Sequence, residues 1–153
     1  MTEPALKCIA IEGDARTCED AIRLCGDALE KAGYVGPNFA QSCVDREHEF
    51  PTGLPSENPI AMPHCKSDDI KEGALCFLRL ENPVVFRRMD DPSQSIITAT
   101  VINLAIKDAG DHLNVLTSII SLLMDRQKSE KLVSMDINEV AGYLEDCIAE
   151  AGL

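Results

Sequence analysis

The chain of 153 residues contains no tryptophan, and aromatic residues make up only 4% of it, so aliphatic side chains must fill its core. No apolar run approaches the ~20 residues that a transmembrane helix needs. The N-terminal residues, MTEPALK, lack the basic start and apolar stretch of a secretory signal. We therefore expect a cytoplasmic protein that folds as a single domain over residues 1–153.

Basic residues are also scarce. The 14 lysines and arginines stand against 26 aspartates and glutamates, which gives a formal charge of −12. Such a surface repels the phosphates of nucleic acids and of anionic membranes, so we expect no nucleic-acid partner. It favours solubility and can steer a basic protein partner toward the chain. Charge alone does not distinguish that role from an ordinary acidic protein.

Seven cysteines are present, but no two of them form a Cys-x-x-Cys pair. Their odd number and the lack of a secretory signal argue against a disulfide framework. Four lie in apolar patterns, where a thiol behaves as a small hydrophobe: Cys25, Cys43, Cys76 and Cys147. We expect reduced structural cysteines, no metal site and no other cofactor.

Both ends of the chain show helical periodicity. A first helix is predicted from Cys18 to Ala32, with Thr17 as its cap. A second has Pro37 in its first turn and ends between residues 46 and 49. Toward the C-terminus we expect three more helices, which we place at 111–125 with Asp111 as the cap, at 129–133, and after Asp136.

The middle of the chain favours strands. Residues 50–59 hold three prolines and a glycine, which predict an ordered loop before a short strand at 60–62. Residues 74–80 form a second candidate strand, with 83–86 as its partner after a tight turn. Residues 96–106 predict a long buried strand. Helices on both sides of a strand-rich centre indicate an α/β fold, a three-layer sandwich.

His64 is the first candidate for chemistry because it follows Pro63 at the end of a short predicted strand. Proline restricts its own backbone and that of the residue before it, so the imidazole is presented from a stiff segment. A neutral histidine has one ring nitrogen with a lone pair and can attack a phosphoryl group without a separate base. Taken alone, the Pro-His dipeptide is weak evidence, because a lone histidine is more often structural or merely solvated.

Other polar residues strengthen this hypothesis. Thr52 and Gly53 can offer a hydroxyl and backbone N–H groups to phosphate oxygens. Arg46, at the end of the second helix, can supply a planar fork for the same oxygens, or can pair with a neighbouring carboxylate. His112 lies in the first turn of its predicted helix, where it can support His64 or remain an exposed residue. His48, between two glutamates, is expected to be a solvated residue at a helix end.

Cys65 leaves two further interpretations open, a redox thiol or a metal ligand shared with His64. Adjacent residues of an extended segment point to opposite faces, which makes joint ligation awkward. Neither interpretation is the one that we favour from the sequence.

These residues, in this order, resemble the enzyme IIA domain of the mannitol/fructose class of the bacterial phosphoenolpyruvate-dependent sugar phosphotransferase system. The resemblance covers nearly the whole chain. Its core consists of three segments, Asp45-Arg46-Glu47, Pro51-Thr52-Gly53-Leu54 and Ile60-Ala61-Met62-Pro63-His64. The Phe50-Pro51-Thr52-Gly53 loop and the His64-Cys65 pair look most like the galactitol-type branch.

The resemblance implies a mixed β-sheet with helices on both faces and a relay of phosphoryl groups. The basic carrier HPr would donate to His64, and His64 would pass the group to a cysteine of a cognate enzyme IIB. Uptake of galactitol or a related polyol through a membrane enzyme IIC would follow. Arg46 and His112 match positions that line the active site in mannitol-type relatives, whereas Glu57 is out of register with a carboxylate of some relatives. The alternative is a regulatory binding module of the nitrogen-regulatory type, controlled by His64 phosphorylation.

Overall fold

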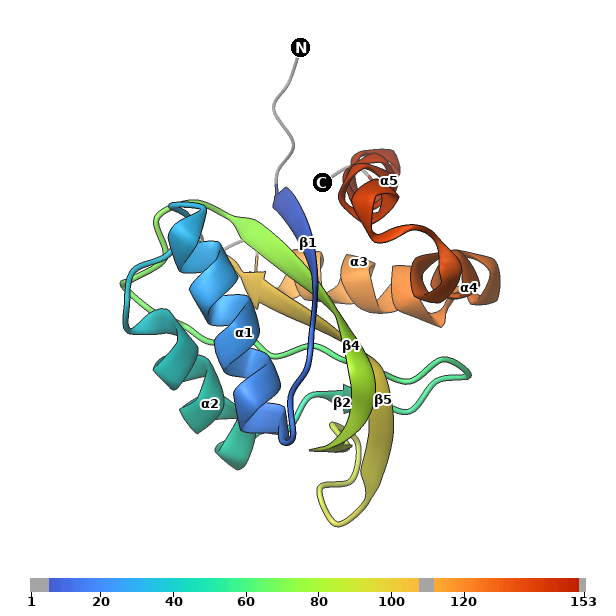
Figure 1. Cartoon of the computed structure of the whole chain (residues 1–153), viewed down its shortest axis with the longest axis horizontal. Coiled ribbons are helices and arrows are strands. Elements are labelled where there is room, and N and C mark those ends of the chain that lie inside the picture. Colours follow the sequence, from blue (N-terminus) through green and yellow to red (C-terminus); the bar gives the residue numbers. More distant parts are fainter. Residues whose placement is uncertain (1–5, 108–111, 152–153) are drawn as a thin grey trace.

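The computed structural model describes residues 6–107 and 112–151, and of His112 and Leu113 it describes the backbone alone. Within these residues, five strands form one mixed sheet in the order β1-β4-β5-β3-β2 (Figure 1). The strands are β1 (Lys7–Gly13), β2 (Gly53–Leu54), β3 (Ile60–Ala61), β4 (Ala74–Arg87) and β5 (Ser95–Ala105). β1 runs parallel to β4 and β3 parallel to β5, while β4–β5 and β2–β3 are antiparallel. The predicted α/β fold with a mixed sheet is confirmed.

Helices α1 (Cys18–Lys31) and α2 (Phe39–Glu49) cover one face of the sheet (Figure 1). Thr17 caps α1 as predicted, because its side chain accepts a hydrogen bond from the N–H of Asp20. The apolar stripe of α1 packs on β4 and β5 in one buried cluster, which includes side chains of α2. Pro37 precedes α2, and its N-cap is Asn38, so this helix begins later than predicted.

The opposite face carries α3 (His112–Met124), α4 (Arg126–Ser134) and α5 (Ile137–Glu150) (Figure 1). Their apolar side chains and the second face of the sheet form a separate buried cluster. Asp136 caps α5 as expected, and Asp125 caps α4, which is longer than the predicted 129–133. The cap predicted at Asp111 falls outside the described residues. Helices on both faces confirm the sandwich architecture.

The predicted hairpin between residues 74–80 and 83–86 is wrong. β4 is one continuous strand through Pro83, and its pairing with β5 shifts register between Arg79 and Val84. The pairing with β1 also ends at Leu80. Pro83 therefore lies where neither neighbour needs a backbone donor, which is the position in which a strand tolerates proline. The sequence prediction mistook this irregularity for a turn.

Two strands were not predicted at all. β1 is an edge strand, and β2 has two residues inside the segment predicted as a loop. The buried strand predicted at 96–106 is confirmed as β5, and that at 60–62 as the shorter β3. None of the helices within the described ranges is long and apolar enough to span a membrane.

Candidate functional site

His64 lies directly beyond β3, at the end of the sheet where β5 finishes. It continues the parallel pairing of β3 with β5 through a bridge to Leu104. The carbonyl of Pro63 accepts hydrogen bonds from Leu104 N and from Asn103 Nδ2, both at 2.9 Å. The backbone on the N-terminal side of His64 is thus fixed to the centre of the sheet. A proline with a locked φ and two bonds to its carbonyl makes a rigid support.

One nitrogen of the His64 ring is committed to the backbone. Nδ1 lies 2.8 Å from the carbonyl oxygen of Met62, and His64 as a whole residue is only 6% exposed. A carbonyl oxygen can only accept a hydrogen bond, so Nδ1 must be the donor. In the neutral ring the lone pair is then on Nε2. The bond to Met62 therefore fixes both the orientation and the tautomer of the imidazole.

His64 borders a surface cavity of about 440 Å³. The cavity walls come from α2 with its C-cap Phe50 and from the segment that contains His64. They consist of Ser42, Asp45, Arg46, Glu49, Phe50, His64, Cys65 and Lys66. The fold thus brings Arg46 and His64 to one cavity, as the sequence predicted that they could. Arg46 and Lys66 place cationic groups at a histidine on an otherwise acidic protein.

Among the described residues, the contacts that hold Arg46 at the end of α2 include no ion pair with a carboxylate. Its guanidinium lies over the ring of Phe50, 4.6 Å from the centroid, and Nη1 is 3.4 Å from the Phe50 carbonyl oxygen. Within the described residues, no ion pair joins Arg46 to Asp45 or Glu49. The alternative of a surface ion pair therefore has no support. Most of the donors of this planar fork remain available to a ligand.

A buried carboxylate supports the segment that carries His64, and sequence reasoning missed it. Glu47 is 4% exposed, and its oxygens accept the backbone N–H of Thr52 at 2.8 Å and the Thr52 hydroxyl at 2.7 Å. Burial raises the pKa of Glu47, while the bonds from Thr52 oppose this shift. Glu47 thereby fixes the start of the loop to α2.

The same threonine connects Glu47 to His64. Oγ1 of Thr52 accepts a hydrogen bond from the N–H of Met62 at 3.2 Å, and the carbonyl of Met62 accepts from His64 Nδ1. An unbroken series of contacts therefore runs from α2 through the loop and β3 to the imidazole. Glu47 and Thr52 act as positioning residues, since neither of them lines the cavity. The sequence signals this arrangement only weakly: Glu47 and Thr52 are five residues apart, on either side of the end of α2.

Residues 5–147 match the family described as phosphoenolpyruvate-dependent sugar phosphotransferase system, EIIA 2. The chain belongs to this family. It is 29% identical over 119 residues to the galactitol-specific EIIA component of Escherichia coli K12, which covers 77% of the chain and 79% of that protein. It is 34% identical over 135 residues to the mannitol-specific EIICBA component of the same strain, covering 85% of the chain and 20% of that larger protein.

Solved structures agree with this assignment. The crystal structure of IIA mannitol from E. coli has a TM-score of 0.71 and 30% identity, covering 94% of this chain and 99% of that one. A complex of enzyme IIA and phosphorylated enzyme IIB of the E. coli mannitol system contains a similar chain, with a TM-score of 0.66, 27% identity and 98% coverage of both. The chain is thus an EIIA component of the galactitol, mannitol and fructose type, part of a phosphotransferase pathway.

The structure of this EIIA does not bring every candidate residue into the cavity. Both donors of Thr52 bond to Glu47, and Gly53 pairs with Ala61 between β2 and β3. A Cβ added at Gly53 would lie 2.6 Å from the carbonyl oxygen of Arg87, so the glycine allows two backbones to approach closely. We therefore exclude Thr52 and Gly53 from the proposed phosphate contacts.

The remaining candidates have different outcomes. The side chain of His112 lies outside the described residues, so its supporting role stays a prediction. His48 is 59% exposed at its side chain and lies 2.8 Å from Glu19, which agrees with a surface position. Glu57 is exposed and pairs with Arg126 at 3.3 Å. Among the described residues, no group of three or more histidines, cysteines or carboxylates is arranged to hold a metal ion.

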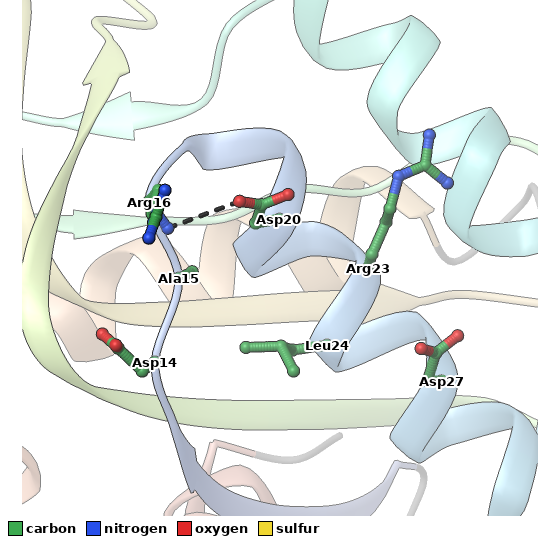
Figure 2. Close-up of a pocket in the computed structure, with 7 residues that line it drawn as sticks. All are labelled: Asp14, Ala15, Arg16, Asp20, Arg23, Leu24 and Asp27. Atoms are coloured by element: carbon green, nitrogen blue, oxygen red, sulfur yellow. Dashed lines mark hydrogen bonds between the residues drawn. The ribbon is translucent and has the colours of Figure 1, made fainter.

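A second hollow, of about 380 Å³, lies between α1 and the segment after β1. Figure 2 shows the carboxylates of Asp14, Asp20 and Asp27 around it, with two arginines. The backbone N–H of Arg16 donates to Asp20 at 3.4 Å, which is a local helix-end contact. The excess of carboxylates disfavours an anionic ligand, so the cavity beside His64 remains the candidate site of this EIIA.

Changing Thr52 to valine tests the proposed support of His64. The variant keeps the shape of the side chain but leaves Oε1 of Glu47 without its donor, and the N–H of Met62 keeps only the Thr52 carbonyl oxygen at 3.3 Å as an acceptor. Each unsatisfied buried group costs about 1–3 kcal/mol, so a lower urea midpoint is expected. We also expect phosphorylation of His64 to slow by about tenfold, less than the ~10²-fold that a 1 Å misplacement can cause.

Ser129→Ala is the matched control, because it removes another buried hydroxyl, on α4, that accepts from Asn58. It should lower stability without slowing phosphorylation, and Thr52→Ser should restore the rate. Nitrogen-15 shifts of the His64 ring in Thr52→Val should report a mixture of tautomers. An unchanged rate and an unchanged tautomer in folded Thr52→Val would contradict a positioning role.

Proposed function

We propose that this EIIA accepts a phosphoryl group from phospho-HPr on Nε2 of His64 and passes it to a cysteine of a cognate enzyme IIB. The observation that carries the proposal is the bond from His64 Nδ1 to the Met62 carbonyl, which leaves the lone pair on Nε2 in a ring that borders the cavity of Arg46. Attack on phosphorus forms the N–P bond as the donor histidine leaves, and no separate base is required. The enzyme is thus a phosphotransferase component with a phosphohistidine intermediate.

Charge supports the assigned role of Arg46. A transferring phosphoryl group carries negative charge on its peripheral oxygens, and positioned cations stabilise that charge. Arg46 is partly buried at the cavity wall and presents a fork that matches two such oxygens. The net charge of −12 favours encounter with a basic donor such as HPr, in a way that salt should weaken.

The transport role follows from the relatives. Galactitol-specific, mannitol-specific and fructose-specific EIIA components are all similar to this chain, and galactitol or a related polyol is the cargo that we propose. In the proposed relay, membrane enzyme IIC takes part only after the phosphoryl group has reached enzyme IIB. A nitrogen regulatory protein IIA from Neisseria meningitidis has a TM-score of 0.71 but only 20% identity, which supports a shared fold alone. We therefore rank the regulatory module below the transport role.

Radiolabelled phospho-HPr tests the proposal directly. We expect one acid-labile, alkali-stable phosphoryl group per chain, followed by its loss to a galactitol-type or mannitol-type enzyme IIB. Enzyme IIB variants that lack their acceptor cysteine are the control and should leave the label in place. Label that stays on the chain with every enzyme IIB of a panel would contradict the transport role, and absence of any labelling would contradict the phosphocarrier itself.

A further inference from the structure

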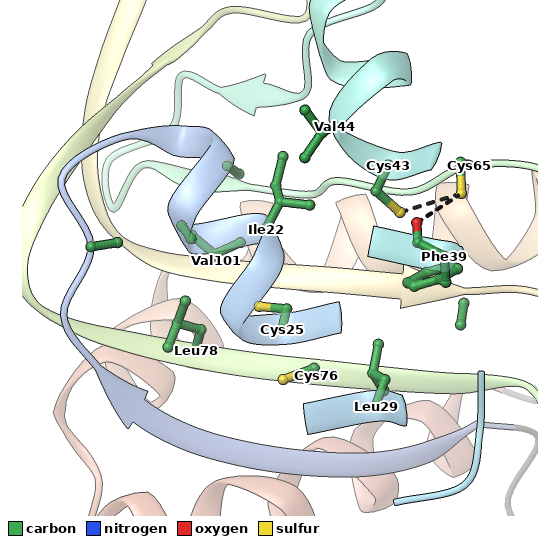
Figure 3. Close-up of a cluster of buried hydrophobic side chains, with 14 of the residues drawn as sticks. Ile22, Cys25, Leu29, Phe39, Cys43, Val44, Cys65, Cys76, Leu78 and Val101 are labelled. Atoms are coloured by element: carbon green, nitrogen blue, oxygen red, sulfur yellow. Dashed lines mark hydrogen bonds between the residues drawn. The ribbon is translucent and has the colours of Figure 1, made fainter. Parts of the chain in front are cut away.

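Two cysteines lie in contact directly behind His64. Cys43 on α2 and Cys65 after β3 are separated by 22 residues in the chain, yet their sulfur atoms are 3.3 Å apart. Figure 3 shows the two sulfurs turned toward each other at the upper edge of the buried cluster. Cys43 is fully buried, and Cys65 is 4% exposed. Contact between two thiols is the first requirement for a disulfide, although the sulfurs must still approach by more than 1 Å to reach the ~2.05 Å of a sulfur–sulfur bond.

The two thiols differ in their surroundings. The S–H of Cys43 points to Cys65, which holds the pKa of Cys65 below its ordinary value, and the charge of Arg46 lowers this pKa further, although burial opposes the shift. The same contact and burial raise the pKa of Cys43. Asn103 Nδ2 lies 3.6 Å from Cys43 Sγ. Cys65 is therefore the thiol that ionises first, with Cys43 beside it as a protonated partner.

Cys65 is also the thiol that small reagents can reach. It lines the cavity that His64 and Arg46 share, whereas Cys43 lies behind it. A peroxide that enters this cavity meets the thiolate first. Another thiol contact, between Cys25 and Cys76, lies deeper in the same cluster, and both of these residues are fully buried (Figure 3). Ionisation and access together distinguish the pair at the cavity from the pair in the core.

We propose that Cys43 and Cys65 are a modification site, a thiol pair that a peroxide converts to a disulfide and that thereby slows phosphoryl transfer at His64. The Cys65 thiolate attacks the peroxide oxygen and becomes a sulfenic acid, and the other oxygen leaves as hydroxide or water. Cys43 then attacks the Cys65 sulfur, forms the sulfur–sulfur bond and releases water. In sum, two thiols lose two electrons and two protons, and one hydrogen peroxide becomes two waters.

The consequence for transfer rests on the function proposed above. Cys65 follows His64 directly, and Cys43 lies one helical turn before Arg46 on α2. Closing the bond requires the sulfurs to approach by more than 1 Å from their 3.3 Å contact. The segments on both sides of the cavity share this movement with the two cysteine side chains, and a misplacement of about 1 Å costs up to ~10²-fold in rate. A thiol pair at this place couples oxidation to the geometry of the site.

Treatment of the reduced full-length chain with hydrogen peroxide, followed by alkylation and mass spectrometry, tests the modification itself. We expect two fewer alkylated thiols, a cross-linked peptide that joins Cys43 to Cys65, and full reversal by dithiothreitol. Cys43→Ala should abolish the cross-link and leave a sulfenic acid on Cys65 that dimedone traps. Cys25→Ala, the same change at another buried cysteine of this cluster, should retain the cross-link. A cross-link between Cys25 and Cys76, or none in the wild type, would overturn the proposal.

Labelling by phospho-HPr, before and after oxidation, tests the effect on transfer. We expect at least a tenfold loss of rate in the wild type and in Cys25→Ala, recovery with dithiothreitol, and no loss in Cys43→Ala. An oxidised, cross-linked chain that is phosphorylated at the reduced rate would overturn the coupling. Failure of the reduced wild type to be labelled would instead contradict the function proposed above, because the mass measurement is independent of activity.

Discussion

His64→Ala is expected to reduce labelling by phospho-HPr to background. In the proposed mechanism the imidazole supplies the nucleophilic nitrogen itself, so no neighbouring group can replace it after truncation. The variant also removes the donor to the buried Met62 carbonyl, at a cost of about 1–3 kcal/mol, which the fold should tolerate. Acid-quenched labelling and a thermal unfolding curve on the same sample separate loss of the nucleophile from loss of structure.

His48→Ala is the matched control for this variant. His48 is an exposed histidine on α2 that bonds to Glu19, and it does not line the cavity. Its removal should leave labelling within about twofold, since exposed ion pairs contribute ~0–1 kcal/mol. Stoichiometric labelling of folded His64→Ala would show that another residue accepts the phosphoryl group. That result would remove the central residue of the proposed mechanism.

Arg46→Ala should slow transfer from phospho-HPr and to enzyme IIB by about 10²–10³-fold, the usual effect of removing one preorganised donor to a developing negative charge. The change is expected in the rate of the chemical step, since the proposed contacts of the fork are to oxygens whose charge increases during transfer. Arg46→Lys should recover part of the rate, because lysine keeps the charge but not the planar fork. Rapid-quench measurement of single-turnover transfer is the appropriate assay.

Arg23→Ala is a suitable control because it removes an arginine from the neighbouring helix, where Arg23 bonds to Gln41 of α2 at 2.6 Å. Arg23→Ala alters the overall charge by the same amount as Arg46→Ala does, and it leaves the cavity beside His64 intact. We expect a small, salt-dependent change in encounter rate alone. Equal single-turnover rates for Arg46→Ala and Arg23→Ala would refute a phosphate contact by Arg46.

Several elements of the fold were predictable because their signals are local. Thr17 at the start of an apolar stripe defined α1, and Asp136 defined the start of α5. The β-branched run that became β5 was equally clear. By contrast, the continuation of β4 through Pro83 depends on where β1 ends and where the pairing with β5 shifts. No local pattern reports the length of a neighbouring strand, so the hairpin prediction was wrong.

The features of the candidate site also fall into two groups, those that the local sequence predicts and those that contacts between distant segments set. Pro63-His64 and the arginine upstream were visible in the chain, whereas the partner that fixes the ring tautomer is a backbone carbonyl, which any residue type offers. Thr52 was predicted to face phosphate, but its hydroxyl bonds to Glu47, because a buried carboxylate requires donors. The contact between Cys43 and Cys65 was hidden for another reason, since it joins a helix to a segment 22 residues away.

The sequence by itself determined the residue that we propose as the phosphoryl carrier, the arginine that we propose as its contact, and the helices on which the scaffold depends. These follow from side-chain chemistry and from periodicities that neighbouring residues impose on one another. Only the tertiary structure decided which nitrogen of His64 carries the lone pair, that Thr52 bonds to Glu47 and Met62, and that two thiols meet beside His64. Those properties arise from contacts between distant segments, and their positions are set by packing on the two faces of the sheet.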